Sequence, residues 1–574
     1  MSNDQVRKER TISSETILKV LTMVMLLSFL VFLLFPLITV FSKVFQSNSG
    51  EFVGFANFAK YFSTPSLMRS IGNSIHVSLV TTVISVGLAF GVAYAISRTN
   101  MPFKKGFQYI AMLPQFVPTM VHGMALVYLF GRQGLITKMG IDIGLYGELG
   151  VVIAEVLYTF PQVLMVLVVA MSSADNRLYE AASCMGAGPG RVFFRVTLPG
   201  MKYGLISAVT IAFTKCFTDF GAPQVVGGNF SVVATDIYKQ VLGQQNMSMG
   251  AVVGVILTIP AIVAFIIDSI SKSKADSESI SSKAVAFKPV ENKKRDIGYF
   301  IYSLFVTALI AVMFVVIALA AFAKRWPYDL TFTLEHFDFD SVLLNSGMKA
   351  IWVSVKMSLL TAVIGGILTF LFAYLIEKSK PMPLVRSICR FFAMMPMALP
   401  GMVIGLAYVM FFNKTGFTIP LIGLVIPNPF HSLYRTLAIM VISNIVHMFS
   451  VTYITATTAL KKLDSEYENV ADSMAVPFYQ VFLHVSMPMS LPAILEIIMY
   501  YFVNTMVTIS ALVFLYTVRN QPMALAILNM DENGDYAAAA AMSLVILLIN
   551  VIVRSIYEIF NYICRRRAEK FSRP

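Results

Sequence analysis

The chain has 574 residues, of which 57% are hydrophobic and 13% charged, with a formal net charge of +13. Soluble domains are about 25% charged, so this composition excludes an ordinary soluble protein and is typical of a membrane protein. A basic chain can bind nucleic acid, but here Lys and Arg are concentrated in alternate segments between apolar runs, which is the pattern that orients a protein in a lipid bilayer. We therefore expect contact with lipid and not with nucleic acid.

Apolar runs long enough to cross about 30 Å of hydrocarbon recur along the whole chain. Backbone polar groups have no partner in lipid, so each run should be a helix. The first run is too long for the core of a signal peptide and is expected to remain as a span. The positive-inside rule places both termini on the cytoplasmic side. The predicted spans are 17–45, 71–97, 107–131, 150–173, 203–223, 250–271, 297–323, 348–376, 390–412, 436–458, 491–516 and 537–560.

A polar island at 175–199 follows the fourth predicted span. Asp175 can cap a short helix, and Gly186 supplies a stop at which positive φ is allowed. Pro189 suits the first turn of a second short helix, which Pro199 breaks. The pattern predicts a helix–turn–helix that presents small residues and an acid.

Polar side chains inside the predicted spans are costly in lipid and are therefore candidates for function. Glu155 lies in the fourth span. Lys215 and Asp219 stand four residues apart in the fifth span, where they share a helical face and can neutralise each other. Gly221 and Pro223 follow, which predicts a break in that helix. The plain alternative is that these side chains hold neighbouring helices together.

The chain repeats this plan after a polar, Ser- and Lys-rich stretch. We expect a first repeat at 1–271, a flexible cytoplasmic linker at 272–296 and a second repeat at 297–574, each repeat with six helices. Six spans return a repeat to the side on which it began, so the repeats are parallel, an architecture in which the substrate path lies at the repeat interface. The predicted fold is an all-α integral membrane protein with about twelve transmembrane helices in two parallel six-helix repeats.

Matched residues support the repeat. Two prolines and a glycine of the third span recur in the ninth, and the polar residues of the fourth and fifth spans have polar counterparts. The pairs are Pro114 with Pro396, Pro118 with Pro400, Gly123 with Gly405, Glu155 with Asn444, Lys215 with Asn504 and Asp219 with Thr508. We expect the side chains of the last two pairs to line the translocation path, and those of the Glu155–Asn444 pair are further candidates.

The polar loop also recurs. The first copy reads Glu180-Ala181-Ala182, three residues, Gly186, nine residues, and then Val196-Thr197-Leu198-Pro199. This pattern resembles the EAA motif of the inner-membrane permeases of binding-protein-dependent ABC importers, and the resemblance covers nearly the whole chain. The second copy departs from the motif: Asn469 replaces the Glu, Val470 replaces the first Ala, Ala475 replaces the Gly and Met487 replaces the Leu, while Ala471 is retained.

The resemblance implies a type I importer permease in the inner membrane of a bacterium, with cytoplasmic termini. In that family the loop inserts into a groove of a cytoplasmic ATPase and transmits its closure. The coupling residues would be Glu180, Ala181, Ala182 and Gly186, together with Asn469, Val470, Ala471 and Ala475. The implied partners are an ABC ATPase, expected as a homodimer, and an extracytoplasmic binding protein that delivers a small solute.

Catalysis is not expected of the chain itself. It contains no Walker A sequence, so ATP would be bound and hydrolysed by a separate subunit, and no cofactor is expected here. The four cysteines and six histidines are scattered, so no metal site is expected either. One alternative is an ion-coupled secondary transporter, with Asp219 or Glu155 as the carrier of a proton or Na⁺. The other is a membrane-embedded enzyme, which the absence of a clustered His, Asp and Glu set disfavours.

Two stretches bear on the substrate. Residues 218–223 (Thr-Asp-Phe-Gly-Ala-Pro) and 234–241 (Ala-Thr-Asp-Ile-Tyr-Lys-Gln-Val) resemble the ferric-iron, thiamine and 2-aminoethylphosphonate branch of these permeases. Within that branch the two stretches most resemble the 2-aminoethylphosphonate permeases, so 2-aminoethylphosphonate is the expected substrate, with ferric iron as the alternative. In such systems the external binding protein does most of the selecting.

Overall fold

The computed structural model describes residues 3–172, 175–278, 285, 287, 289–343, 346–418, 425–464, 466–474 and 476–571. Within them the regular structure is helical apart from two small antiparallel sheets of two strands each. Eight helices are long and apolar enough to cross a membrane, and the described residues contain up to twelve spans if each of four bent helix pairs counts as one. The predicted all-α membrane fold is confirmed.

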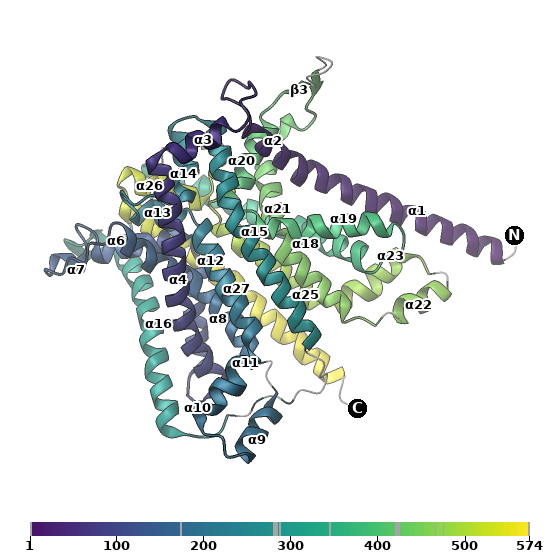
Figure 1. Cartoon of the computed structure of the whole chain (residues 1–574), viewed down its shortest axis with the longest axis horizontal. Helices are drawn as coiled ribbons and strands as arrows, with labels where there is room; N and C mark the ends of the chain where they lie inside the picture. The colour runs from purple at the N-terminus through teal and green to yellow at the C-terminus, as the bar shows by residue number, and fades with distance from the viewer. Residues whose placement is uncertain are drawn as a thin grey trace. The chain divides into compact units, whose positions relative to one another are not determined.

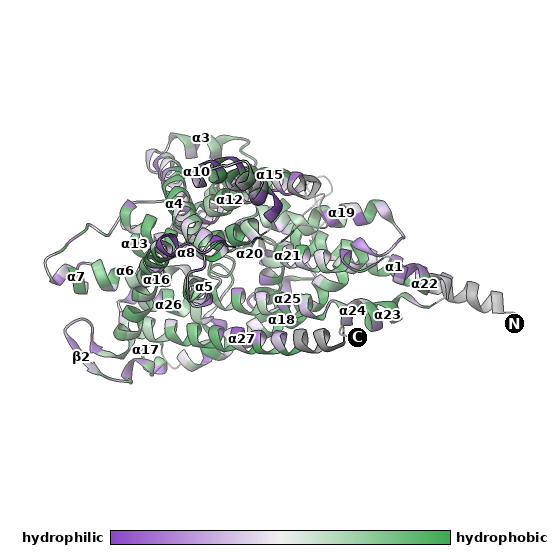
Figure 2. Cartoon of the chain, turned by 90° about the horizontal axis from the view of Figure 1, so that it is seen from below, coloured by the Kyte–Doolittle hydropathy of each residue, from purple (hydrophilic) through white to green (hydrophobic). Residues whose placement is uncertain are grey.

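The eight uninterrupted spans coincide with predicted ones. Figure 2 shows that the helices of these spans, such as α18, are largely apolar, whereas polar residues gather in short helices such as α22. The spans are Ser14–Lys43, Pro65–Arg98, Glu148–Ser172, Met247–Lys272, Lys293–Phe322, Gly347–Glu377, Leu437–Lys461 and Tyr536–Ile563.

The third and ninth predicted spans are sharply bent, so the expectation of one continuous helix in each is wrong. Proline has no amide hydrogen and disfavours a helical conformation in the residue before it. Val117, before Pro118, is accordingly extended with ψ 154°, and Leu399, before Pro400, has ψ 121°. The bent pairs are Lys104–Phe116 with Thr119–Lys138, at 102°, and Pro383–Ala398 with Gly401–Phe412, at 114°.

The fifth and eleventh spans end earlier than predicted, and at equivalent points. Helix α12 (Lys202–Thr218) stops before Asp219, and α25 (Leu491–Val507) stops before Thr508. Both of these residues are extended, with ψ of 139° and 125°. The break expected near Gly221 is therefore present, two residues upstream of that glycine.

The helices form two compact units that do not coincide with the sequence repeats. The first unit comprises 45–344 and 527–545, and the second comprises 1–44, 345–526 and 546–574. Each unit thus contains the first span of the other repeat. The repeat boundaries at 271 and 297 remain a prediction from the sequence.

The first unit is built around α4, α8 and α12. Leu164 and Leu167 of α8 pack with Ala208 of α12 in its core, and Val306 and Ile310 bring α16 against α4 (Figure 1). The elements of this unit are α3 (Ala56–Ser63), α4 (Pro65–Arg98), α5 (Lys104–Met112), η2 (Leu113–Phe116), α6 (Thr119–Phe130), α7 (Leu135–Lys138), α8 (Glu148–Ser172), α9 (Asn176–Cys184), α10 (Pro189–Val192), η3 (Phe193–Thr197), α11 (Leu198–Gly200), α12, α13 (Gly221–Val226), α14 (Val233–Tyr238), η4 (Lys239–Gly243), α15 (Met247–Glu278), α16 (Lys293–Phe322), β1 (Ala323–Arg325), β2 (Asp329–Phe332), η5 (Glu335–Phe337) and α17 (Phe339–Val342).

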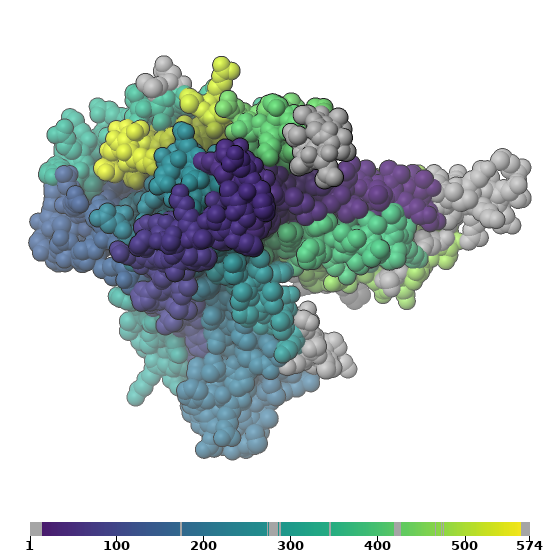
Figure 3. Space-filling model, turned by 45° about the horizontal axis from the view of Figure 1, so that its top comes forward, coloured from purple at the N-terminus to yellow at the C-terminus, as the bar shows by residue number. Residues whose placement is uncertain are grey.

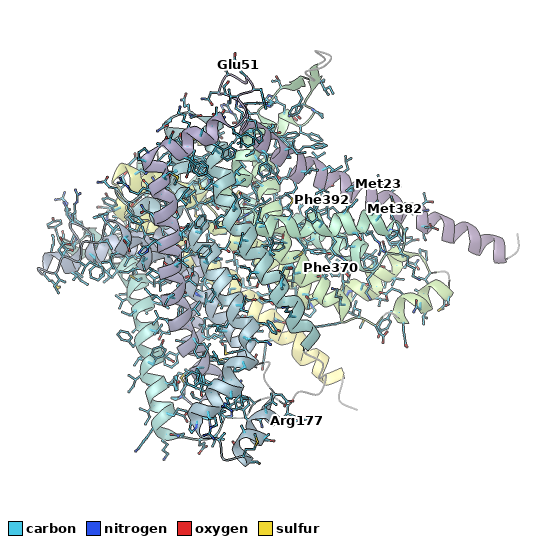
Figure 4. The ribbon with its side chains drawn as sticks, in the orientation of Figure 1. Met23, Glu51, Arg177, Phe370, Met382 and Phe392 are labelled. Carbon is cyan, nitrogen blue, oxygen red and sulfur yellow. The ribbon has the colours of Figure 1, made fainter. Side chains whose placement is uncertain are left out.

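The second unit has α18, α21 and α25 at its centre. The N-terminal helix lies along α19, near the labelled Met23 and Phe392 of Figure 4, and Phe29 meets the ring of Phe372 edge-on at 5.7 Å. Its elements are α1 (Asn3–Phe29), η1 (Leu30–Leu34), α2 (Phe35–Lys43), α18 (Gly347–Glu377), α19 (Pro383–Met394), η6 (Met395–Ala398), α20 (Gly401–Phe412), β3 (Gly416–Thr418), β4 (Val425–Pro427), η7 (His431–Leu433), α21 (Leu437–Lys461), α22 (Glu466–Ser473), α23 (Phe478–Val481), η8 (Phe482–Ser486), α24 (Met487–Met489), α25 and η9 (Val518–Asn520). The two units divide α26 (Met523–Asn533) and α27 (Tyr536–Phe571) between them.

Candidate functional site

The first loop, residues 175–200, folds as the helix–turn–helix that the sequence predicts. The Asp175 carboxylate caps α9 by accepting the amide hydrogen of Arg177 at 3.0 Å. At the other end Gly186 adopts φ +68°, and its amide hydrogen bonds to the carbonyl of Ser183. The amide of Ala187 then reaches the carbonyl of Ala182, which completes a Schellman ending that favours glycine at this position.

Helix α9 exposes an apolar stripe at the end of its unit, which lies at the bottom of Figure 3 in blue and near the labelled Arg177 in Figure 4. Leu178 is 58% exposed and Met185 is 77% exposed, and Ala181 lies on the same helical face. Glu180 is exposed beside this stripe, where Asn176 donates a hydrogen bond of 2.7 Å to its carboxylate.

The four predicted coupling residues of the first loop do not all face outward. Glu180, Ala181 and Gly186 are exposed, whereas Ala182 is 4% exposed and belongs to the inner face of α9. The small side chain of Ala182 therefore lets α9 lie close to its own unit, while Ala181 leaves room for another surface.

The second loop, residues 464–489, repeats this geometry. The Asp464 carboxylate accepts the amide hydrogen of Glu466 at 3.0 Å and caps α22. The amide of Val476 donates to the carbonyl of Ala471 at 2.9 Å, which is the equivalent of the bond from Ala187 to Ala182 in the first loop. Ala475, which replaces the motif glycine, lies outside the described residues.

The surface of α22 is also equivalent to that of α9. Tyr467, Val470 and Met474 are 47%, 57% and 71% exposed, and they occupy the positions of Leu178, Ala181 and Met185. Asn469 is exposed and Ala471 is half-buried. The same three exposed residues, together with the imidazole of His484, line a concave surface beside α22. Each loop therefore offers an apolar stripe of the same spacing.

An aromatic trio holds each loop to its own unit. Phe193 of η3 meets Phe90 and Tyr94 of α4 edge-on, with ring centroids 5.9 and 6.2 Å apart. The equivalent trio of the second unit is Phe482 with Phe370 (labelled in Figure 4) and Tyr374, at 5.7 and 5.0 Å.

The loops lead directly into the broken spans. The segment Pro189–Gly200 meets Lys202–Thr218 at 66°, and Phe478–Met489 meets Leu491–Val507 at 77°. Each loop is thus continuous with a span whose other end carries two of the predicted path residues.

Part of the linker contacts the first loop. The carbonyl of Val285 accepts the amide hydrogen of Asn176 at 2.9 Å, and the amide of Val285 donates to the Asp175 carboxylate at 3.3 Å. Asn100, after α4, donates to the carbonyl of Pro289 at 3.2 Å. These described residues of the linker, expected as a flexible tether, have defined partners.

The structure brings together three of the predicted polar residues in the first unit. Glu155 is fully buried, and neither of its oxygens makes a hydrogen bond of standard geometry within the described residues. Lys215 and Asp219 are close enough to act on its charge. The Lys215 ammonium donates to the Tyr158 hydroxyl at 3.2 Å, and Asp219 accepts the amide hydrogen of Ala222 at 3.0 Å.

Their counterparts in the second unit are more separate. Asn444 is fully buried, and its amide makes no hydrogen bond within the described residues. Asn504 donates to the carbonyl of Tyr500 at 2.8 Å, and Thr508 donates to the carbonyl of Asn504 at 2.6 Å. The assignment of all six side chains to a translocation path remains a prediction.

No group of three or more His, Cys, Asp or Glu side chains that could hold a metal ion occurs among the described residues. Two basic residues with a notable position were not singled out from the sequence: Arg98 at the end of α4 and Lys378 directly after α18. Their signal was available, because each follows an Ala-Tyr pair at the same interval, Ala93-Tyr94 and Ala373-Tyr374.

Comparison with known proteins gives a consistent match over both repeats. Residues 84–276 and 365–562 each match the family model described as "Binding-protein-dependent transport system inner membrane component". One loop lies in each matched stretch. The matches together cover more than half of the chain.

The relatives include the ferric transport system permease protein FbpB of Actinobacillus pleuropneumoniae, which is 25% identical over 560 residues, 95% of this chain and 77% of the relative. The molybdenum transport system permease protein ModB of Mycobacterium tuberculosis is 28% identical over 219 residues, 38% of this chain and 83% of its own length. A solved bacterial alginate ABC transporter is similar over 48% of this chain and 98% of its own, with 20% identity and a TM-score of 0.39.

Proposed function

Because this chain belongs to the family of binding-protein-dependent transport system inner membrane components, we propose that its two loops are the docking sites for the ATPase of an ABC importer. The chain is a multi-pass, non-catalytic permease subunit of such an importer. Its class implies an ATPase and a binding protein as partners.

The observation that carries the docking proposal is the equivalence of the two exposed stripes. Leu178, Ala181 and Met185 on α9 match Tyr467, Val470 and Met474 on α22 in spacing and exposure. Complete burial of one such large side chain contributes about 1.5–3 kcal/mol. Two equivalent stripes suit a partner with two equivalent grooves, so we propose an ATPase homodimer. The coupling residues are then Glu180, Ala181 and Gly186 at the surface, with Ala182 beneath, and Asn469, Val470, Ala471 and Ala475 in the second loop.

The order of the helices along the chain sets the route by which a movement of each loop reaches the spans. A displacement of α9 passes through η3 and α11 into α12, which ends at Asp219. In the second repeat the same route runs from α22 into α25 and ends at Thr508. We propose that the polar side chains near these ends, Lys215, Asp219, Asn504 and Thr508, line the solute path. Glu155 and Asn444, which are fully buried and make no hydrogen bond of standard geometry among the described residues, are further candidates for this path.

The proposed orientation puts both loops, both termini and the linker in the cytoplasm and the chain in the inner membrane of a bacterium. The concentration of Lys and Arg in alternate segments supports this placement.

The proposed solute is a small one delivered by an extracytoplasmic binding protein, and ferric iron is its first candidate. The support is the ferric transport permease that aligns with 95% of the chain. The second candidate, 2-aminoethylphosphonate, rests on the wording of 218–223 and 234–241. Residues 232–237 are buried, so the first half of the second stretch packs inside its unit. Calorimetry on the binding protein encoded beside this chain, with ferric iron and 2-aminoethylphosphonate as titrants, separates the two.

Co-purification tests the docking proposal. The wild-type chain should retain an ATPase with a Walker A motif, and Glu180→Lys should weaken the complex about tenfold, equivalent to 1.4 kcal/mol. Lys60→Glu, a reversal at an exposed residue of α3, is the control. An ion-coupled carrier, the alternative supported by the buried Glu155, would move solute in vesicles without any ATPase, and that result contradicts the proposal.

A further inference from the structure

Beneath each loop a basic residue sits at the end of the second span of its repeat. Arg98 ends α4, and Lys378 directly follows α18. Both are largely withdrawn from solvent: Arg98 is 3% exposed, and the Lys378 side chain is 11% exposed. A buried cation is costly unless its surroundings compensate it, so the groups around each one are informative.

Arg98 joins four segments of the first unit. Its Nη2 donates to the carbonyl of Met171, near the end of α8, at 2.8 Å. Its guanidinium carbon lies 4.7 Å from the ring centroid of Tyr179 on α9 and 4.1 Å from that of Phe287 in the linker. The two rings meet each other edge-on at 4.8 Å. The compensation is therefore a cation–π stack of the kind that favours arginine.

Lys378 makes the equivalent connection with other chemistry. Its ammonium donates to the carbonyl of Leu463, just after α21, at 3.0 Å. It also pairs with the Glu468 carboxylate of α22 at 3.0 Å, where the Glu468 side chain is 15% exposed. Glu468 occupies the repeat position of Tyr179. The partner on the loop has changed from a ring to an acid, while the connection of three helix ends is retained.

These contacts lie away from the docking stripes. Tyr179 and Ala182 share the inner face of α9, and Glu468 and Ala471 share that of α22, whereas the exposed stripes run along the neighbouring face, roughly 100° further around each helix. Removal of either cation thus leaves the docking surface chemically unchanged. It removes only the connection between the loop and the ends of the two spans beneath it.

We propose that Arg98 and Lys378 are equivalent positioning residues that lock the two loops to their spans, the first through a cation–π stack completed by the linker residue Phe287 and the second through an ion pair with Glu468. This inference rests on the proposed function, because the contacts of Arg98 and Lys378 would transmit a movement of the ATPase from each loop to the spans. A loop without its lock still binds the ATPase but turns against its unit instead of moving α4 or α18.

The test separates docking from coupling. Lys378→Glu and Glu468→Lys should each leave ATPase co-purification within about twofold of wild type but lower the ratio of solute transported to ATP hydrolysed by roughly fivefold or more. The double variant with both changes restores the pair in reverse and should recover that ratio. Arg98→Ala and Phe287→Ala should lower the ratio in the first unit, and Arg98→Lys should recover part of it.

Arg554→Met is the matched control, because it breaks an ion pair of 2.6 Å with Glu558 in the second unit, on α27. Its transport ratio should stay at the wild-type value. The inference is overturned if the single reversals keep the wild-type ratio, or if the double variant melts like wild type and stays uncoupled. If a reversal prevents folding, Glu468→Gln supplies the same comparison. Failure of the wild-type chain to bind an ATPase at all would instead refute the proposed function.

Discussion

Gly186 shows how a single residue sets the end of α9. Its φ of +68° is unfavourable for an L side chain by roughly 1–2 kcal/mol, and nothing lies within 4 Å of a Cβ built there. Gly186→Ala should therefore loosen the Schellman ending by strain alone, without a clash. Faster hydrogen exchange at the amides of α9 measures the effect. Gly188→Ala is the control, since that glycine has equally open space but a negative φ of −68°. Equal effects of the two changes contradict the backbone argument.

Asp236 makes the stability of the first unit depend on pH. Burial raises its pKa to about 6, although Ser70 and Lys239 act in the opposite direction. An unfolded Asp has a pKa of about 3.9, so between these values the folded unit holds a proton that the unfolded chain has released. Stability then falls as the pH rises through that window, by about 3 kcal/mol in total.

Replacing the acid removes this dependence. Asp236→Asn should raise the melting temperature in detergent at pH 7.5 and have little effect at pH 4. Asp142→Asn, at an exposed position of the same unit, should change neither value. An equal shift at both pH values for Asp236→Asn would mean that its protonation is not involved.

At the scale of elements, the aromatic trios decide how firmly the loops are held. Phe193→Ala removes the two edge-on ring contacts that the loop makes with α4, each contributing about 0.5–1.5 kcal/mol beyond burial. The loop should then open more often, which hydrogen exchange of α9 measures. The neighbouring Phe194 is 67% exposed, so Phe194→Ala should leave the exchange rates of α9 close to wild type. Similar acceleration by both variants would contradict the role given to Phe193.

The elements also show which features the sequence determines locally. The cap at Asp175, the stop at Gly186 and the break of the fifth span depend on neighbours within a few residues, and all three were predicted, the break at Gly221 rather than before Asp219. The bends at Pro118 and Pro400 are local too. They were missed because apolar composition on both sides indicates one span, whatever its path. Apolar composition indicates how long a segment in lipid is, but it does not indicate whether the helix runs straight or bends.

The repeated Ala-Tyr pairs mark the positions of Arg98 and Lys378 in the sequence, but the contacts of these two residues could not be predicted from it. Arg98 meets Met171 and Phe287, residues that only tertiary packing brings near it. The exchange of the first spans between the two units is likewise non-local, since nothing in the 17–45 run indicates which helices it will cover. The pattern of apolar and polar residues predicts a helix and which of its faces is exposed. Which helix packs against its other face depends on the whole fold.

At the scale of the whole molecule, the two loops should be unequal. The first retains every motif position except Val196, whereas the second has lost the acid at Asn469. Glu180→Ala should therefore lower the transport ratio more than Asn469→Ala, by roughly fivefold. ATP-driven uptake in proteoliposomes, normalised to ATP hydrolysis, gives both values. Equal losses would show that the acid of the first loop has no special part in coupling.

Contact of both loops with an ATPase can be tested by site-directed cross-linking. Cys184 is exposed on α9, and Ser473 is its counterpart on α22, while Cys216 and Cys389 are buried. A photoactivatable thiol probe is attached either to Cys184 or to Ser473→Cys in a chain that also carries Cys184→Ser. Both chains carry Cys564→Ser, which removes the thiol in the terminal segment, and their cross-linking is compared. An adduct with the ATPase is expected from both positions, at yields that change when ATP binds. A purified complex that gives an adduct from neither position would contradict that expectation.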